Sequence, residues 1–193
     1  EMYDKEVFAP FADSFCEKRS TFKPAELSSF VWSYAALRVP DEKVLGAVSE
    51  VAVQKIDAFK LSDLAVLAFS YGCFEIGEKE VFHAIAQRTL NCLQENNNVN
   101  SDDGTSFLFA REVSQILWAF AKTRLRHQRL LQNASEIFSN LSTQTHPILN
   151  GQDLVQCVWS FVELEDTPND RIDAVLLRFA QCFNQWRSFM SPL

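Results

Sequence analysis

The chain has 193 residues, of which 47% are hydrophobic and 22% charged, values typical of a globular protein that can bury a core in one domain or one continuous stack. Its formal net charge of −7 excludes a generally basic nucleic-acid binder, so any RNA contact must depend on a local patch. No apolar run approaches the ~18 residues of a membrane span, and no signal-peptide pattern opens the chain, so we expect no membrane insertion.

The first segments in chain order are helical by their spacing. Residues 4–19 resemble the second half of a helix pair. Glu26 then opens a segment in which Leu27, Phe30 and Tyr34 share one helical face while Trp32 lies on a neighbouring face. A helix that is apolar on two sides must be packed between others. The following helix is more amphipathic, with its inward positions at Leu45, Val48, Ala52 and Ile56.

The same pattern returns three more times. Segment 63–74 repeats 26–37 without a gap at an offset of 63 − 26 = 37 residues. Further copies begin at Glu112 and Asp153, at offsets of 112 − 63 = 49 and 153 − 112 = 41. The aligned aromatic residues, which we expect to be equivalent and buried, are Trp32, Phe69, Trp118 and Trp159.

The repeat predicts the fold class and the domain organisation. We expect an all-α protein, a right-handed α-solenoid of antiparallel helix pairs that repeat about every 37 residues. The whole chain, 1–193, forms one array. Its predicted parts are a half repeat at 1–20, repeats at about 21–58, 59–94, 106–142 and 148–190, and an asparagine-rich polar loop at 95–105.

The repeat resembles a known class. Phe22–Ala35, with the sequence FKPAELSSFVWSYA, is similar to the heptatricopeptide and octotricopeptide repeats of organellar proteins. Many of those proteins also carry a C-terminal RAP domain, whereas this chain reaches Leu193 without one. The resemblance implies a mitochondrial, or alternatively plastid, RNA-associated factor, and some members are components of mitochondrial ribosomes.

Motifs for catalysis, metals and cofactors are missing from the sequence. The three histidines are not spaced as metal ligands, and the five cysteines form no C-x-x-C pair. There is no G-x-S-x-G elbow, no H-E-x-x-H motif and no glycine-rich phosphate loop. We therefore expect no catalytic residues, no metal and no cofactor, and buried free thiols at Cys16, Cys73, Cys92, Cys157 and Cys182.

One cluster of basic residues indicates a candidate site for an anionic ligand. Basic residues gather at the turn between the two helices of the third repeat, with one more nearby in sequence, and we predict that they contact RNA phosphates. The alternative is an ordinary solvated turn, or one paired with neighbouring acids. The predicted RNA-binding residues are Arg111, Lys122, Arg124, Arg126, His127 and Arg129.

Two partner hypotheses follow. The first is an RNA-associated component of a mitochondrial ribonucleoprotein such as the mitoribosome, touching organellar rRNA or mRNA at the basic turn and other proteins elsewhere. The second is a protein–protein scaffold or assembly factor of an organellar complex without direct RNA contact, since solenoids offer long surfaces to either partner.

Overall fold

The computed structural model describes residues 5–99, 109–139, 150–164, 173–181 and 184. Within these ranges every regular element is a helix, which confirms the all-α prediction. No helix in this part of the chain is long and apolar enough to cross a membrane. Residues 173–181 are also helical. The other helices are α1 (Lys5–Lys18), η1 (Arg19–Thr21), α2 (Pro24–Ala36), α3 (Glu42–Gln54), η2 (Ile56–Ala58), α4 (Leu61–Phe74), α5 (Lys79–Val99), α6 (Ala110–Lys122), α7 (Gln128–Ser139) and α8 (Gly151–Leu164).

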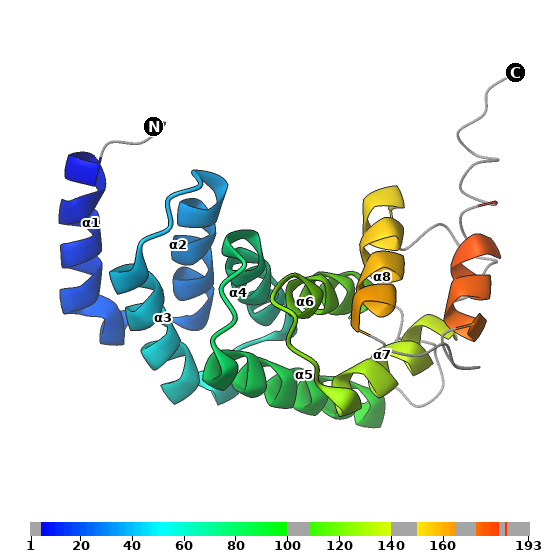
Figure 1. Cartoon of the computed structure of the whole chain (residues 1–193). Helices are drawn as coiled ribbons and strands as arrows, with labels where there is room; N and C mark the ends of the chain where they lie inside the picture. The colour runs from blue at the N-terminus through cyan, green and yellow to red at the C-terminus, as the bar shows by residue number, and fades with distance from the viewer. Residues whose placement is uncertain (1–4, 100–108, 140–149, 165–172, 182–183, 185–193) are drawn as a thin grey trace, which may run out of the picture.

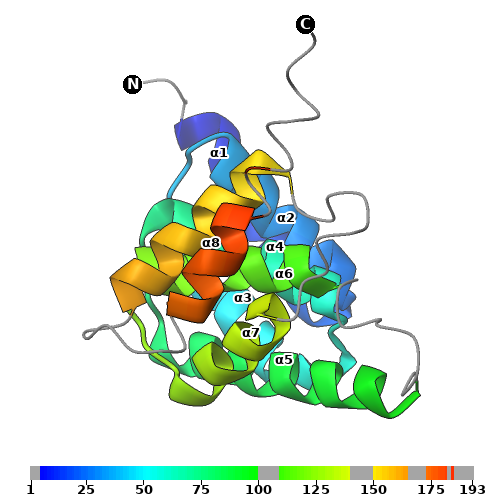
Figure 2. The same cartoon turned by 90° about the vertical axis from the view of Figure 1, so that its right-hand side faces the viewer.

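The helices lie in two layers. The most extensive contacts join α2 to α4, α4 to α6 and α6 to α8, so these four helices form a continuous row (Figure 1). A second row is made by α1, α3, α5 and α7, each in contact with the next. Figure 2 looks along the first row and shows α5 and α7 beneath it. Each helix of the first row therefore has one side left open, opposite the second layer.

Three of the first-row helices, α2, α4 and α8, begin in the same way. The backbone N–H of Lys23 donates to Glu26 Oε2 at 2.8 Å, and that of Lys60 donates to Asp63 Oδ2 at 3.2 Å. The N–H of Asn150 donates to Asp153 Oδ2 at 3.2 Å. These are the acids at the start of the aligned segments, and each satisfies a donor that the helix leaves free. The recurring acid thus has a local structural function.

Three of the first-row helices, α2, α4 and α6, also end alike. Arg38, Glu75 and Arg124 have φ values of 56°, 57° and 54°, in the left-handed region that non-glycine residues seldom adopt. The N–H of the next residue bonds the carbonyl five positions back in all three cases: Val39 to Tyr34, Ile76 to Tyr71 and Leu125 to Phe120, at 2.9, 3.2 and 3.0 Å. The separations of 75 − 38 = 37 and 124 − 75 = 49 residues equal the offsets of the sequence alignment.

Apolar side chains fill the space between the layers. Leu27, Leu64 and Val113 occupy aligned positions in α2, α4 and α6 and are fully buried. Of the four inward positions predicted for α3, Leu45, Val48 and Ala52 are buried, whereas Ile56 is half-buried and begins η2. Burial of a side chain of this size is worth roughly 1.5–3 kcal/mol, so this shared core is the main stabilising feature of the fold.

The predicted polar loop is wrong at its start. Residues 95–99 belong to α5, which continues to Val99, and residues 100–105 lie outside the described part of the chain. Arg88 supplies a physical reason, because its Nη1 donates to Glu95 Oε1 at 2.8 Å and its Nε donates to the carbonyl of Phe59 at 3.1 Å. Side-chain contacts of this kind outweigh a polar composition. The predicted repeat boundaries at 142, 148 and 190 also lie outside the described residues.

The prediction that all four aligned aromatic residues are buried is also wrong. Trp32 is 50% exposed and Trp159 is 38% exposed, while Phe69 and Trp118 are half-buried. A repeated position fixes where a side chain lies around the helix, but it does not say which side of that helix is covered. Here the aromatic position faces away from the second layer, on the open side of the row.

Candidate nucleic-acid interface

The open side of the first row carries one set of aligned positions. On α2 these are Ala25, Ser29, Trp32 and Ala36, whose spacing of four, three and four residues keeps them on one helical face. The same positions on the next helices complete a surface that we call the aromatic face. Its other members are Ser62, Val66, Phe69 and Cys73 on α4, Arg111, Gln115, Trp118 and Lys122 on α6, and Gln152, Gln156, Trp159 and Glu163 on α8. All of them are exposed or half-buried.

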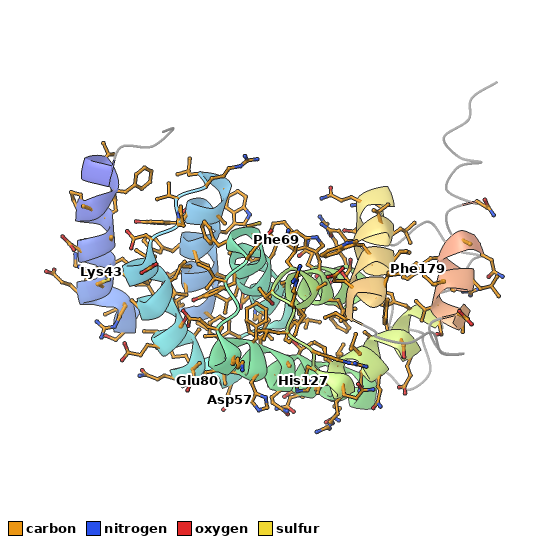
Figure 3. All side chains as sticks on the ribbon, in the orientation of Figure 1. Lys43, Asp57, Phe69, Glu80, His127 and Phe179 are labelled. Carbon is orange, nitrogen blue, oxygen red and sulfur yellow. The ribbon has the colours of Figure 1, made fainter. Side chains whose placement is uncertain are left out.

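The aromatic face has an aromatic centre and polar margins. Phe69 stacks on Trp118 with ring centroids 4.7 Å apart, and Trp32 and Trp159 extend the row at either end. Figure 3 shows Phe69 on the side of the row away from α5 and α7. The sequence analysis treated these residues as core and so missed them as site residues. The residues three and four positions away from each tryptophan share its helical face, and most of them are small or polar. That pattern in the sequence could have indicated that the tryptophans are exposed.

Arg111 lies apart from the rest of the predicted basic patch. It sits in the first turn of α6, eleven residues before Lys122, which corresponds to three turns and about 16 Å along the helix axis. Both residues are on the aromatic face, at opposite ends of α6. Arg111 and Lys122 therefore place positive charge at either end of the helix that carries Trp118.

Lys122 and Arg124 lie next to an acid of the preceding unit. Lys122 Nζ is 2.5 Å from Glu75 Oε1, which links the end of α6 to the end of α4. That hydrogen bond, the charge of Lys122 and the charge of Arg124 together lower the pKa of the Glu75 carboxyl below its usual value. The alternative of pairing with neighbouring acids therefore holds for Lys122, whose positive charge is partly offset.

Arg126 and His127 belong to a different surface. Together with Lys79 and His83 they line a cavity beside the starts of α5 and α7. Figure 3 places His127 and Glu80 on the second-layer side of the molecule, far from Phe69. Arg129 is exposed in the first turn of α7. The predicted residues are thus divided between the aromatic face, the surroundings of Glu75 and this cavity, and Arg129 belongs to none of the three.

The described cysteines and acids do not gather into a metal site, and the expectation of buried thiols is wrong for Cys73, which is exposed. No group of three or more His, Cys, Asp or Glu side chains able to hold a metal occurs among the described residues. Cys157 is fully buried, and burial raises the pKa of its thiol to about 12, with hydrogen bonding to Ser114 acting in the opposite direction. A thiol with this pKa stays protonated and unreactive near neutral pH.

Comparison with known proteins does not assign the chain to a family. No protein-family model matches it, and no curated protein sequence matches it.

Proposed function

We propose that this chain is an RNA-associated helical-repeat protein of mitochondria, or alternatively plastids, built as a right-handed α-solenoid of antiparallel helix pairs. The shared beginnings of α2, α4 and α8 and the shared ends of α2, α4 and α6, at the spacings of the sequence alignment, support the repeat. The resemblance of Phe22–Ala35 to heptatricopeptide and octotricopeptide repeats supports the organellar ribonucleoprotein setting, such as a mitochondrial ribosome. The role is one of binding and not of catalysis.

The observation that carries the proposal is the exposure of the aligned aromatic residues. Large aromatic side chains are normally buried, yet Trp32 and Trp159 are 50% and 38% exposed at equivalent positions. Stacking of a base on an aromatic ring is worth roughly 1–3 kcal/mol and tolerates any base. A row of such rings, one on each first-row helix, is suited to an unpaired strand whose bases are free to stack.

The polar members of the aromatic face complete this assignment. Arg111 and Lys122 lie beside Trp118, where they can contact the phosphates of a bound strand. Gln115 and Gln156 occupy aligned positions next to Trp118 and Trp159, and their amides both donate and accept hydrogen bonds. Such a surface can bind locally even though the chain as a whole carries a charge of −7.

The test is the binding of single-stranded RNA by the chain and by its Trp32→Ala, Trp159→Ala double variant. We expect the double variant to weaken binding by roughly tenfold or more, since two stacking partners are lost. Phe11→Ala is the matched control, because Phe11 is 62% exposed on α1, outside the aromatic face. Equal losses in both variants, or no loss in either, would disprove the assignment of the aromatic face to RNA.

The basic turn can be tested separately by salt titration. If Arg124, Arg126 and Arg129 each contact a phosphate, changing all three to glutamine should flatten the log–log salt dependence by about 2 units, at about 0.7 per contact. An unchanged slope would remove the turn from the interface and leave Arg111 and Lys122 as the phosphate contacts.

The scaffold function remains a second candidate because of one observation at the end of the first row. Val155 and Val162 on α8 are 63% and 61% exposed. Their aligned positions on the earlier helices, including Ser114 and Ala121, are buried where the next helix of the row packs. A protein helix could dock there, and a partner lost on changing Val155 and Val162 to aspartate, but kept in the tryptophan variant, would favour this function.

A further inference from the structure

A cavity of about 460 Å³ lies between the start of α5 and the turn that leads into α7. Phe82, Phe120 and Leu125 form its apolar floor. Lys79, His83, Arg126 and His127 surround it with basic groups, and Glu80 is the single acid in the lining. Four basic side chains from two successive helix pairs therefore meet around one hollow.

The hydrogen bonding of His127 leaves one of its ring nitrogens available as a donor. Its Nδ1 accepts the backbone N–H of Leu130 at 3.3 Å. A neutral ring bonded in this way carries its hydrogen on Nε2. Nε2 lies 3.5 Å from Gln87 Nε2, at the limit of a hydrogen bond, so the amide does not hold this donor tightly. The ring can thus donate to a ligand without first becoming charged.

His83 lies close enough to His127 to act on it electrostatically. The ring centroids of His83 and His127 are 5.8 Å apart. Burial lowers the pKa of His127, and the nearby His83 and Arg129 lower it further, against a smaller opposing effect of its backbone hydrogen bond. Basic groups outnumber Glu80, the one acid in the cavity lining, and a bound anion would offset the positive charge of protonated His127.

Alignment of the helix pairs shows that Lys79 and His83 are not needed to form such a turn, whereas His127 contributes a cap to α7. Asp41, Glu78 and His127 occupy the same position before α3, α5 and α7. Asp41 Oδ1 accepts the N–H of Val44 at 3.0 Å, the same bond that His127 makes to Leu130. The residues of α3 that align with Lys79 and His83 are Glu42 and Gly46, so α3 forms without comparable basic groups.

We propose that this cavity is a phosphate-binding site, in which Lys79, His83, Arg126 and His127 hold the oxygens of a phosphate group. Donors on side chains that carry or can acquire positive charge give the strong, short hydrogen bonds that phosphate accepts. The apolar floor leaves room for the group that carries the phosphate, such as a nucleoside. The site is separate from the aromatic face, and the inference does not depend on the proposed RNA function.

The experiment is an NMR titration of the histidine ring signals of the full chain with inorganic phosphate and with adenosine 5′-monophosphate. We expect the His83 and His127 signals to shift together and to saturate. The Lys79→Gln, His83→Gln double variant should bind phosphate about tenfold more weakly or worse, with His127 as the reporter. Lys60→Gln is the matched control, because Lys60 is an exposed lysine before α4, away from the cavity.

A second titration tests the participation of His127. Sulfate does not change its charge near neutral pH, so its affinity should increase as pH falls through the range in which the histidines protonate. His127→Asn retains a side chain that can cap α7 and should reduce this pH dependence. Absence of any shift with phosphate, or equal weakening by Lys60→Gln, would overturn the proposal.

The source of the phosphate is distinguished by RNA oligonucleotides with and without a 5′-phosphate. Tighter binding of the phosphorylated strand, lost in the Lys79→Gln, His83→Gln variant, would identify an RNA terminus as the ligand. Binding of inorganic phosphate or the mononucleotide with no gain for the phosphorylated strand would identify a free phosphate compound. The Trp32→Ala, Trp159→Ala variant should keep its response to inorganic phosphate, so failure of the RNA function and failure of this site give different results.

Discussion

The ring of Phe69 on α4 stacks on the indole of Trp118 on α6, with centroids 4.7 Å apart and planes inclined by 26°. This contact joins two neighbouring helices of the first row across the aromatic face. Trp32 and Trp159 make no ring contact with another aromatic residue in the described part of the chain and are more exposed. Phe69 and Trp118, at the centre of the aromatic face, are therefore stabilised by packing on each other, whereas the rings of Trp32 and Trp159 at its two ends are more accessible to solvent.

This difference predicts unequal costs for truncating the tryptophans. Trp118→Ala should lower the free energy of unfolding by about 3 kcal/mol, because the half-buried indole loses its packing on Phe69 and leaves a space. Trp32→Ala should cost about 1 kcal/mol, since half of its surface is already in water. Urea denaturation of both variants measures the difference. A larger loss for Trp32→Ala would mean that the orientation of α2 is wrong.

Replacing a helical glycine by alanine should have opposite effects on stability at Gly72, which packs against Trp118, and at Gly46, which has open space beside it. A Cβ added at Gly72 would lie 2.9 Å from Trp118 Cζ3 and 3.0 Å from Ala119 Cα, so Gly72→Ala should destabilise the fold by about 1–3 kcal/mol. Gly46, inside α3, has nothing within 4 Å of such a Cβ. Gly46→Ala should therefore stabilise the protein by about 0.5–1 kcal/mol through helix propensity. Thermal and urea unfolding of the pair will show whether the signs differ.

Two aligned tyrosines should respond differently to loss of the hydroxyl. Tyr71 Oη lies 2.6 Å from Ser49 Oγ and 2.8 Å from the carbonyl oxygen of Leu45, all in the core. Tyr71→Phe should cost about 1–2 kcal/mol, because it leaves buried polar groups with fewer partners. The hydroxyl of Tyr34 is buried without a partner in the described residues, since Ala12 aligns with Ser49.

Tyr34→Phe is thus the control for Tyr71→Phe, because it removes a hydroxyl that makes no hydrogen bond in the described residues. It should be neutral or slightly stabilising, because the buried hydroxyl is removed at no cost in hydrogen bonds. Unfolding free energies from chemical denaturation decide both cases. Equal destabilisation by the two substitutions would contradict the hydrogen bonds assigned to Tyr71.

Cys157 predicts a loss of stability at alkaline pH. Burial raises the pKa of its thiol to about 12, whereas an unfolded cysteine ionises near pH ~8.5. Above that pH the unfolded chain releases a proton that the folded chain retains, so stability is fully present below about pH 8 and falls as pH rises towards 12. Urea denaturation at a series of alkaline pH values should show this slope, and Cys157→Ala should flatten it. An unaltered slope would show that other groups dominate.

The sequence by itself determined the helices and their alignment. Helical spacing around Leu27, the recurring acid and the aligned tryptophans are local features, and they predicted the helical class and the offset of 37 residues at which the turn of Arg38 recurs at Glu75. The same local reasoning failed at residues 95–99, where the ion pair of Arg88 with Glu95 and the bond to Phe59 extend α5 through contacts that composition does not reveal.

Only the tertiary structure decided which side of each helix is open and which charges face one another. Periodicity places Trp32 and Trp159 at one angle around their helices, but solvent exposure depends on where the second layer packs. The basic residues from Lys122 to Arg129 lie close together in sequence, yet the left-handed turn at Arg124 separates them in space. Lys122 pairs with Glu75, and Arg126 and His127 line the cavity with Lys79 and His83. These partners are some 40 residues or more away along the chain, and their meeting is set by the packing of one helix pair on the next.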